Sequence, residues 1–106
     1  IADAACRFIR QAAADEAPYF CYVPFNAPHS PFQVKPVDRE RYAQADKPTV
    51  KEKLKGMIWS MDQGIGRILQ TIEETGESDD TQVWILSDNG GVGRFPENNR
   101  PLRGSK

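Results

Sequence analysis

Residues 19–25 (YFCYVPF) and 81–86 (TQVWIL) are the two stretches that decide the fold class. Both are short, largely apolar runs, and neither alternates between apolar and polar residues. Runs of this kind are typical of parallel strands that are covered on both faces of a sheet. The sequence therefore predicts two buried strands.

A long amphipathic helix is predicted between the strands. Thr49 and Glu52 have the spacing of a capping box, and Gly76 is suited to end the helix in a left-handed conformation. Gly64 and Gly66 lie inside the helix, and close backbone packing is the expected reason. An apolar stripe at helical spacing contains Leu54, Met57, Ile58, Met61, Ile65, Ile68, Leu69 and Ile72.

A further helix and a long loop complete the expected order. Residues 1–15 place apolar side chains at helical spacing, and Pro18 is expected to close this helix, since the residue before a proline disfavours helical backbone. Residues 26–48 contain Pro28, Pro31, Pro36 and Pro48. Connections longer than about 12–15 residues without structure of their own are usually functional or disordered. The prolines favour a fixed path, so the loop is a candidate for function.

The order helix, strand, loop, helix, strand predicts an α/β fold that contains a βαβ unit. If both strands are parallel in one sheet, Phe25 and Leu86 end at the same carboxyl edge, where ligands bind in open α/β sheets. The loop 26–31 and the turn 87–91 are therefore expected to face one crevice.

The composition argues against two classes of partner. The 106-residue chain has a formal net charge of −1 at pH 7, whereas nucleic-acid surfaces and membrane-surface helices need clustered Lys and Arg. No apolar run approaches the roughly 20 residues of a membrane span. Neither nucleic acid nor a membrane is therefore an expected partner. Cys6 and Cys21 fit no zinc or redox spacing, and free thiols are favoured over a disulfide between them.

Three polar residues at the predicted carboxyl edge could carry chemistry. Asp88 and Asn89 offer the hard oxygen donors that calcium or magnesium prefers. A hairpin is the alternative for this turn, because Asn-Gly is a common hairpin signal, although residues 92–96 supply no alternating strand. His29 is the single histidine, and imidazole is well suited to donate a proton near neutral pH. A solvated loop histidine is the competing interpretation.

Four motifs in this order resemble the type I sulfatases of the alkaline-phosphatase-like superfamily. They are residues 26–31 (NAPHSP), 61–69 (MDQGIGRIL), 87–91 (SDNGG) and 100–106 (RPLRGSK). The resemblance implies a larger, mostly parallel sheet sandwiched by helices. It also implies hydrolysis of a sulfate ester on a small molecule or carbohydrate, and a periplasmic or extracellular location (lysosomal in a eukaryote).

The resemblance implies roles for individual residues as well. Asp88 and Asn89 match a pair that supplies two calcium ligands in the family. His29 and Lys106 match residues that contact the sulfate, so both are expected to be catalytic and substrate-binding residues. Asp62 matches a recurrent helix position, and no chemical role is assigned to it. In the implied mechanism a formylglycine attacks sulfur, calcium and Lys106 neutralise the sulfate oxygens, and His29 helps the alcohol depart.

The nucleophile itself has no match. The family makes formylglycine from Cys or Ser in a Cys/Ser-x-Pro/Ala-x-Arg motif. Residues 6–10 (CRFIR) share the Cys and Arg spacing, but Phe8 replaces the central Pro or Ala, and the segment lies in a predicted helix. Residues 1–106 are therefore expected to be an internal fragment of a sulfatase catalytic domain. The fragment would lack the upstream nucleophile segment, be inactive alone, and have the rest of its own domain as a partner.

Two alternatives stay open. A phosphodiester or phosphonate hydrolase of the same superfamily would share the Asp-Asn turn and the strand order, and the residue at the nucleophile position would distinguish it. A non-catalytic homologue is the second alternative. The joint retention of His29, Asp88, Asn89 and Lys106 argues against it.

Overall fold

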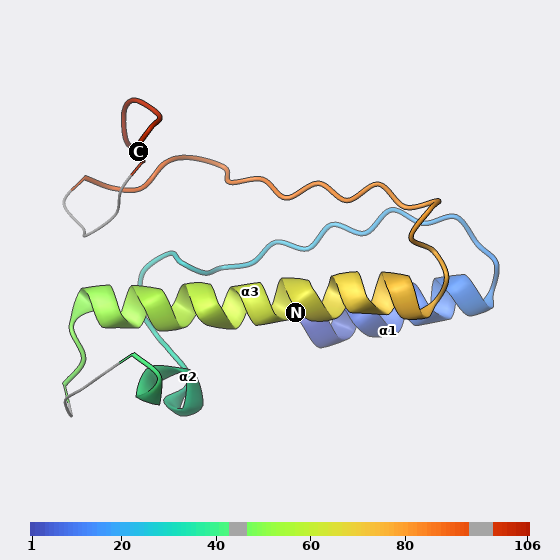
Figure 1. Ribbon diagram of the computed structural model, residues 1–106, viewed down its shortest axis with the longest axis horizontal. Coiled ribbons are helices and arrows are strands. Elements are labelled where there is room, and N and C mark those ends of the chain that lie inside the picture. The colour runs from blue at the N-terminus through green and yellow to red at the C-terminus, as the bar shows by residue number, and fades with distance from the viewer. Residues whose placement is uncertain (43–46, 94–98) are drawn as a thin grey trace.

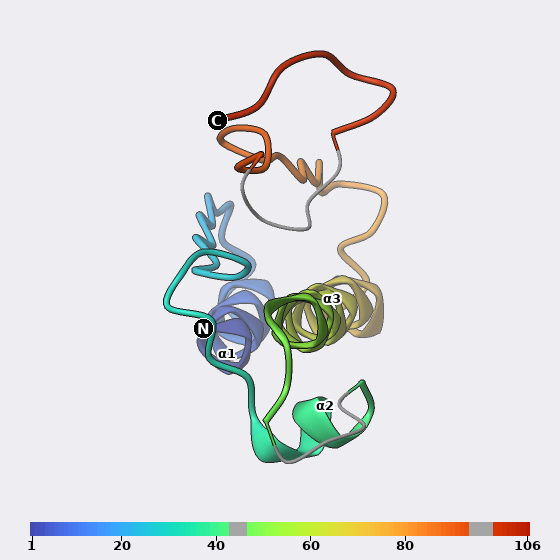
Figure 2. The ribbon, with the colours of Figure 1, turned by 90° about the vertical axis from the view of Figure 1, so that its left-hand side faces the viewer.

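The computed structural model describes residues 1–42, 47–93 and 99–106, and contains three helices within these ranges. They are α1 (Ala2–Ala14), α2 (Pro36–Glu40) and α3 (Val50–Glu74). α1 and α3 lie side by side and run in the same direction (Figure 1). Extended segments 19–25 and 81–86 lie on one side of this helix pair, and α2 lies on the other side (Figure 2).

Both predicted ends of α3 are confirmed. The Thr49 hydroxyl accepts a hydrogen bond from the backbone N–H of Glu52 at 3.3 Å, and the Glu52 carboxylate accepts one from the backbone N–H of Thr49 at 2.7 Å. Gly76 has a φ of +76°, and its N–H and that of the next residue donate to carbonyls of the last turn at 3.0 Å each. This pattern is a Schellman motif, for which glycine is the favoured residue.

The core lies between α1 and α3. Its buried apolar residues are Ala2, Ala5, Cys6, Ile9 and Ala12 on α1, and Leu54, Met57 and Ile72 on α3. The predicted close packing is confirmed at Gly64, where an added Cβ would lie 3.2 Å from the Phe25 ring and 3.4 Å from the Ala2 Cβ. It is wrong for Gly66, where an added Cβ would meet nothing within 4 Å. Ile58 and Leu69, from the predicted stripe, are exposed.

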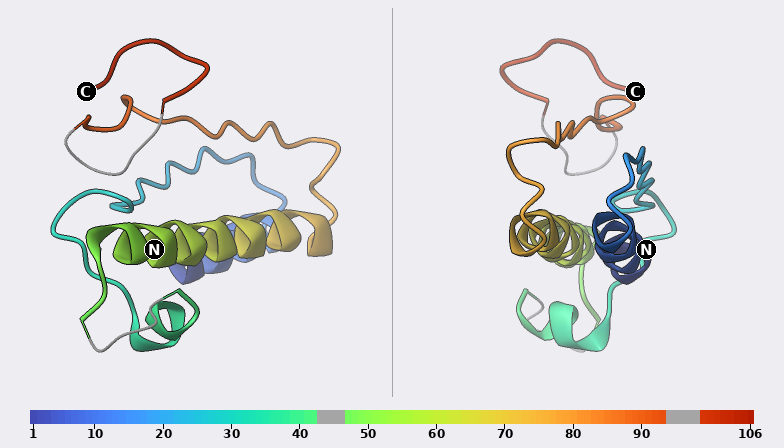
Figure 3. Two further views of the ribbon diagram at one scale, coloured as in Figure 1. Left: turned by 60° about the vertical axis from the view of Figure 1, so that its left-hand side comes forward. Right: turned by 90° about the vertical axis from the view of Figure 1, so that its right-hand side faces the viewer.

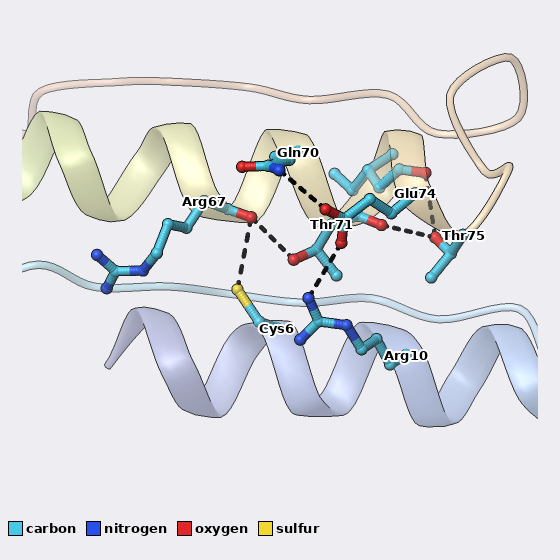
Figure 4. A network of polar contacts seen from close by, with 8 residues as sticks. Cys6, Arg10, Arg67, Gln70, Thr71, Glu74 and Thr75 are labelled. Atoms are coloured by element: carbon cyan, nitrogen blue, oxygen red, sulfur yellow. Dashed lines mark hydrogen bonds and ion pairs between the residues drawn. The ribbon is translucent and has the colours of Figure 1, made fainter.

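Polar side-chain contacts link α1 to α3 along their interface (Figure 4). Arg10 pairs with Glu74 and Arg67 pairs with Asp3, each at 3.2 Å and largely exposed. Exposed ion pairs contribute only about 0–1 kcal/mol each, so the buried apolar seam dominates the pairing. Cys6 is buried, with its Sγ 3.6 Å from the Arg67 carbonyl oxygen. This packing places the thiol in the interface between α1 and α3.

The two predicted strands are extended but form no strand ladder in the part of the chain that the structure describes. They run in the same direction, as predicted (Figures 1 and 3). No backbone hydrogen bond joins them within the described ranges, and their side-chain link is the 3.3 Å contact between Tyr19 Oη and Thr81 Oγ1. A ladder needs a neighbouring backbone about 4.8 Å away. The first segment instead rests on α3 through the Phe25 side chain. Two strands of a βαβ unit were predicted, and the described ranges contain extended segments in their places but no strands.

Both extended segments expose large apolar side chains. In 19–25 exposed and half-buried residues alternate, whereas in 81–86 every residue after Thr81 is exposed. Phe20 and Tyr22 are 89% and 78% exposed, and Trp84 and Leu86 are 77% and 83% exposed. Cover on both faces was predicted for both segments, but the described residues cover one face of 19–25 and leave 82–86 exposed. Large apolar side chains that are exposed together mark a surface that another part of a protein contacts.

Smaller differences concern α1 and the connection between the segments. α1 ends at Ala14 because Glu16 takes a left-handed conformation with a φ of +51°, two residues before Pro18. The connection 26–48 contains α2, so it is not without structure of its own. Residues 43–46 of that connection, and residues 94–96 of the predicted non-strand tail, lie outside the described residues. None of the described helices is long and apolar enough to cross a membrane.

Candidate active site

His29 lies in a turn directly after the first extended segment. Its backbone N–H donates to the Asn26 carbonyl at 2.9 Å, which closes the turn. Its ring Nδ1 lies 2.7 Å from the Ser30 carbonyl oxygen, and the side chain is exposed. Since a carbonyl oxygen can only accept, Nδ1 carries the proton in this contact. The other ring nitrogen, Nε2, is left to accept or donate a proton toward a substrate.

Asp88 and Asn89 lie in a tight turn after the second extended segment. The Ser87 hydroxyl donates to the Asn89 backbone carbonyl at 2.6 Å and fixes the turn. The Asn89 amide nitrogen donates to the Gly90 carbonyl at 2.9 Å. This orientation leaves the amide oxygen of Asn89 available to a cation. Asp88 is exposed.

Lys106 is brought to the same turn by the backbone. Its N–H donates to the Gly91 carbonyl at 3.1 Å. The approach requires the chain to reverse just before it, and Gly104 provides this with a φ of +83°, a conformation that glycine adopts without steric cost. The structure therefore joins the predicted lysine to the predicted Asp-Asn turn.

Asn99 was missed by the sequence reasoning, which began the last motif at Arg100. Its side-chain amide bonds the N–H and carbonyl of Gly91 and the carbonyl of Gly104. The available signal was an amide residue directly before a Gly- and Pro-containing motif. Such a side chain can satisfy both kinds of backbone group at once.

The site residues lie at one end of the molecule. Figure 1 shows the carboxyl ends of both extended segments, and the C-terminus, on its left-hand side. The loop 26–31 and the turn 87–91, which were predicted to face one crevice, thus lie at the same end of the molecule. Within the described ranges, His29 contacts none of Asp88, Asn89 and Lys106. The structure joins the Lys106 backbone to Gly91, just after the Asp-Asn pair, and places the His29 turn at the same end of the molecule. Asp62 is exposed in the middle of α3.

The oxygen donors fit one side of a calcium site. Asp88 supplies a carboxylate and Asn89 an amide oxygen, which are ligands that calcium prefers, but calcium takes 6–8 oxygens. In the ranges that the structure describes, no cluster of three or more His, Cys, Asp or Glu could hold a metal. Further carboxylate or imidazole ligands of such a site would therefore have to come from outside these ranges.

Comparisons with known proteins give one consistent family. A sequence model of the family described as Sulfatase matches residues 1–106. A sulfatase of Formosa agariphila is 31% identical over 121 aligned residues, which cover 97% of this chain and 20% of that protein. The uncharacterized sulfatase YdeN of Escherichia coli is 29% identical over 106 residues, which cover 100% of this chain and 18% of that protein. The chain thus spans about a fifth of the length of these relatives.

Solved structures agree with the sequence comparisons. The crystal structure of Ps i-CgsB in complex with k-i-k-neocarrahexaose superposes with a TM-score of 0.86 at 30% identity, over 99% of this chain and 23% of that chain. A second crystal structure of Ps i-CgsB gives a TM-score of 0.83 at 29% identity, over 96% of this chain and 22% of that chain. These matches imply an alkaline-phosphatase-like fold. Because the family match extends from residue 1 to residue 106, the chain belongs to the sulfatase family.

Proposed function

We propose that residues 1–106 are an internal part of the catalytic domain of a calcium-assisted sulfuric ester hydrolase. The observation that carries the proposal is the 3.1 Å hydrogen bond from Lys106 to Gly91. It holds the Lys106 backbone against Gly91, two residues after Asn89, so a cationic residue and two residues with oxygen donors lie on joined loops. In this proposal the nucleophile, a formylglycine, is contributed from outside residues 1–106, so the isolated chain is inactive.

The residues of this chain have separate tasks. Lys106 neutralises negative charge on the sulfate oxygens, a contribution that grows as charge develops in the transition state. His29 donates a proton from Nε2 to the ester oxygen as its bond to sulfur breaks. Nδ1 keeps its own proton before and after this transfer, and donates it in a hydrogen bond to the Ser30 carbonyl. Sulfatases are generally metal-dependent, and a calcium ion held by Asp88 and Asn89 would supply Lewis-acid stabilisation of the sulfate.

The proposed substrate is a sulfated carbohydrate. One solved relative was crystallised with k-i-k-neocarrahexaose, an oligosaccharide, and it superposes over nearly the whole chain. Carbohydrate sulfates have alkoxide leaving groups, which need a proton donor, and His29 at the same end as Lys106 meets that need. By family analogy, we place the complete enzyme in the periplasm or outside the cell (in the lysosome of a eukaryote).

The reaction class is tested by comparing two ester substrates in the complete protein. Nitrophenyl sulfate and bis(nitrophenyl) phosphate carry the same leaving group but differ in the central atom. We expect kcat/KM for the sulfate ester to exceed that for the phosphodiester by at least about 100-fold, a difference of about 2.7 kcal/mol in transition-state stabilisation. A preference for the phosphodiester would replace the proposal by the phosphodiester hydrolase alternative.

The rest of the domain is proposed to complete a mostly parallel sheet around residues 19–25 and 81–86. The unpaired backbones and the exposed Phe20, Tyr22, Trp84 and Leu86 support this. Isolated residues 1–106 are therefore expected to unfold without a cooperative transition and to bind a hydrophobic dye, since two unpaired segments do not make a stable sheet. Calorimetry and dye fluorescence measure both properties. A sharp, monomeric melt at high temperature would contradict the fragment assignment.

A further inference from the structure

The Asn99 side chain joins the two loops that carry proposed site residues. Its Oδ1 accepts a hydrogen bond from the Gly91 N–H at 2.8 Å, and its Nδ2 donates to the Gly91 carbonyl at 3.3 Å and to the Gly104 carbonyl at 2.9 Å. The Lys106 N–H donates to the same Gly91 carbonyl at 3.1 Å. One half-buried amide therefore holds the turn after Asp88 and the segment before Lys106 in a single arrangement.

The contacts require an amide at this position. Gly91 presents an N–H and a carbonyl to Asn99, and a side-chain amide offers an acceptor and two donors in one plane. An aspartate would keep the acceptor and lose both donors. The packing is also close, because a Cβ added at Gly90 would lie 3.2 Å from both the nitrogen and the oxygen of the Asn99 amide.

The Asn99 amide restricts how the turn at Gly91 and the segment at Gly104 can move relative to each other. Glycine has the greatest backbone freedom of any residue, and Gly90, Gly91 and Gly104 all lie in these loops. Without Asn99, the Lys106 backbone would keep one described hydrogen bond to the turn, the one to Gly91. We propose that Asn99 is a positioning residue that holds Lys106 in register with the Asp88–Asn89 turn, an inference that rests on the proposed sulfate-binding role of Lys106.

Inhibition of the complete enzyme by inorganic sulfate tests the proposal, because it measures anion binding without any chemical step. Asn99→Ala and Asn99→Asp are each expected to raise the Ki of sulfate about 10–100-fold, the range typical for loss of a residue that orients a ligand. Gln11→Ala is the control, since it removes an exposed amide that bonds Asp15 at 3.0 Å on α1, and its Ki should not change. A lower kcat with an unchanged Ki in both Asn99 variants would reduce Asn99 to a stability role and overturn the proposal.

A double-mutant cycle with Lys106→Ala shows whether Asn99 acts through Lys106. We expect the double variant to bind sulfate within about 3-fold of Lys106→Ala alone, because coupled residues give non-additive effects. Additive losses would overturn the positioning role. A wild-type Ki in Lys106→Ala would overturn the proposed sulfate-binding role together with the inference. Weak sulfate binding in Lys106→Ala, combined with a wild-type Ki in Asn99→Ala, would overturn the role of Asn99 alone.

Discussion

Asp88→Ala in the complete protein is expected to abolish calcium retention and to lower kcat/KM by about 100-fold or more. A hard cation loses one of its few charged ligands in this variant, and a bound metal supplies several kcal/mol of charge stabilisation. Asn89→Ala should have the same effect less severely, since it removes a neutral oxygen. Metal content of the purified proteins, measured by atomic emission, gives the first readout, and kcat/KM for nitrophenyl sulfate gives the second.

Asp80→Ala is the matched control for Asp88→Ala. Asp80 is also an exposed aspartate, directly before the same extended segment, in a turn closed by its N–H to the Glu77 carbonyl at 3.2 Å. It lies at the opposite end of that segment from Asp88, so calcium content and activity should stay at wild-type levels. Unchanged calcium content in Asp88→Ala would remove Asp88 from the metal site.

His29→Ala is expected to discriminate between leaving groups. A nitrophenolate departs readily without a proton, whereas a sugar alkoxide does not, and general acid catalysis typically contributes about 10²–10⁴-fold. The kcat/KM of the variant on a sugar sulfate should therefore fall by a factor within this range. Its kcat/KM on nitrophenyl sulfate should fall far less. Ser30→Ala is the control, because the Nδ1 contact is to the backbone carbonyl of Ser30 and survives the substitution.

The pattern of losses separates the possible roles of His29. Equal losses on both substrates would show that His29 binds the sulfate group, which the two substrates share, and would defeat the proton-donor role. Wild-type kinetics on both would place His29 outside the site. Measuring kcat and KM separately distinguishes lost transition-state stabilisation from lost binding.

Features set by a few neighbouring residues could be predicted from the sequence. The capping box of Thr49 and Glu52 and the left-handed Gly76 depend on contacts within one turn of the helix, so spacing alone identifies them. The left-handed end of α1 was missed because Glu16, unlike Gly76, is a residue that rarely adopts that conformation.

Features that depend on a distant partner could not be predicted in the same way. Apolar runs at 19–25 and 81–86 predict extended backbone and its direction, but a strand ladder also needs a neighbour, and the described part of the chain does not supply one. Asn99 escaped notice because its role arises where Gly91 and Gly104 meet, 13 residues apart in sequence. Asp88 and Asn89 were indicated by their oxygen donors and by motif resemblance, and Lys106 by the resemblance alone. The structure adds the backbone contact between Lys106 and Gly91.

The way α1 and α3 are fastened has a consequence for experiments at different ionic strengths. Their two ion pairs are exposed, and such pairs weaken as the Debye length shrinks to about 8 Å at physiological ionic strength. The buried apolar contacts between the helices do not depend on screening in this way. Phe25, which packs against Gly64 of α3, comes just before the turn that carries His29. The helix frame should therefore keep its geometry as salt is added. A decline of kcat/KM with salt would then report screening between an anionic substrate and Lys106 rather than a distorted scaffold.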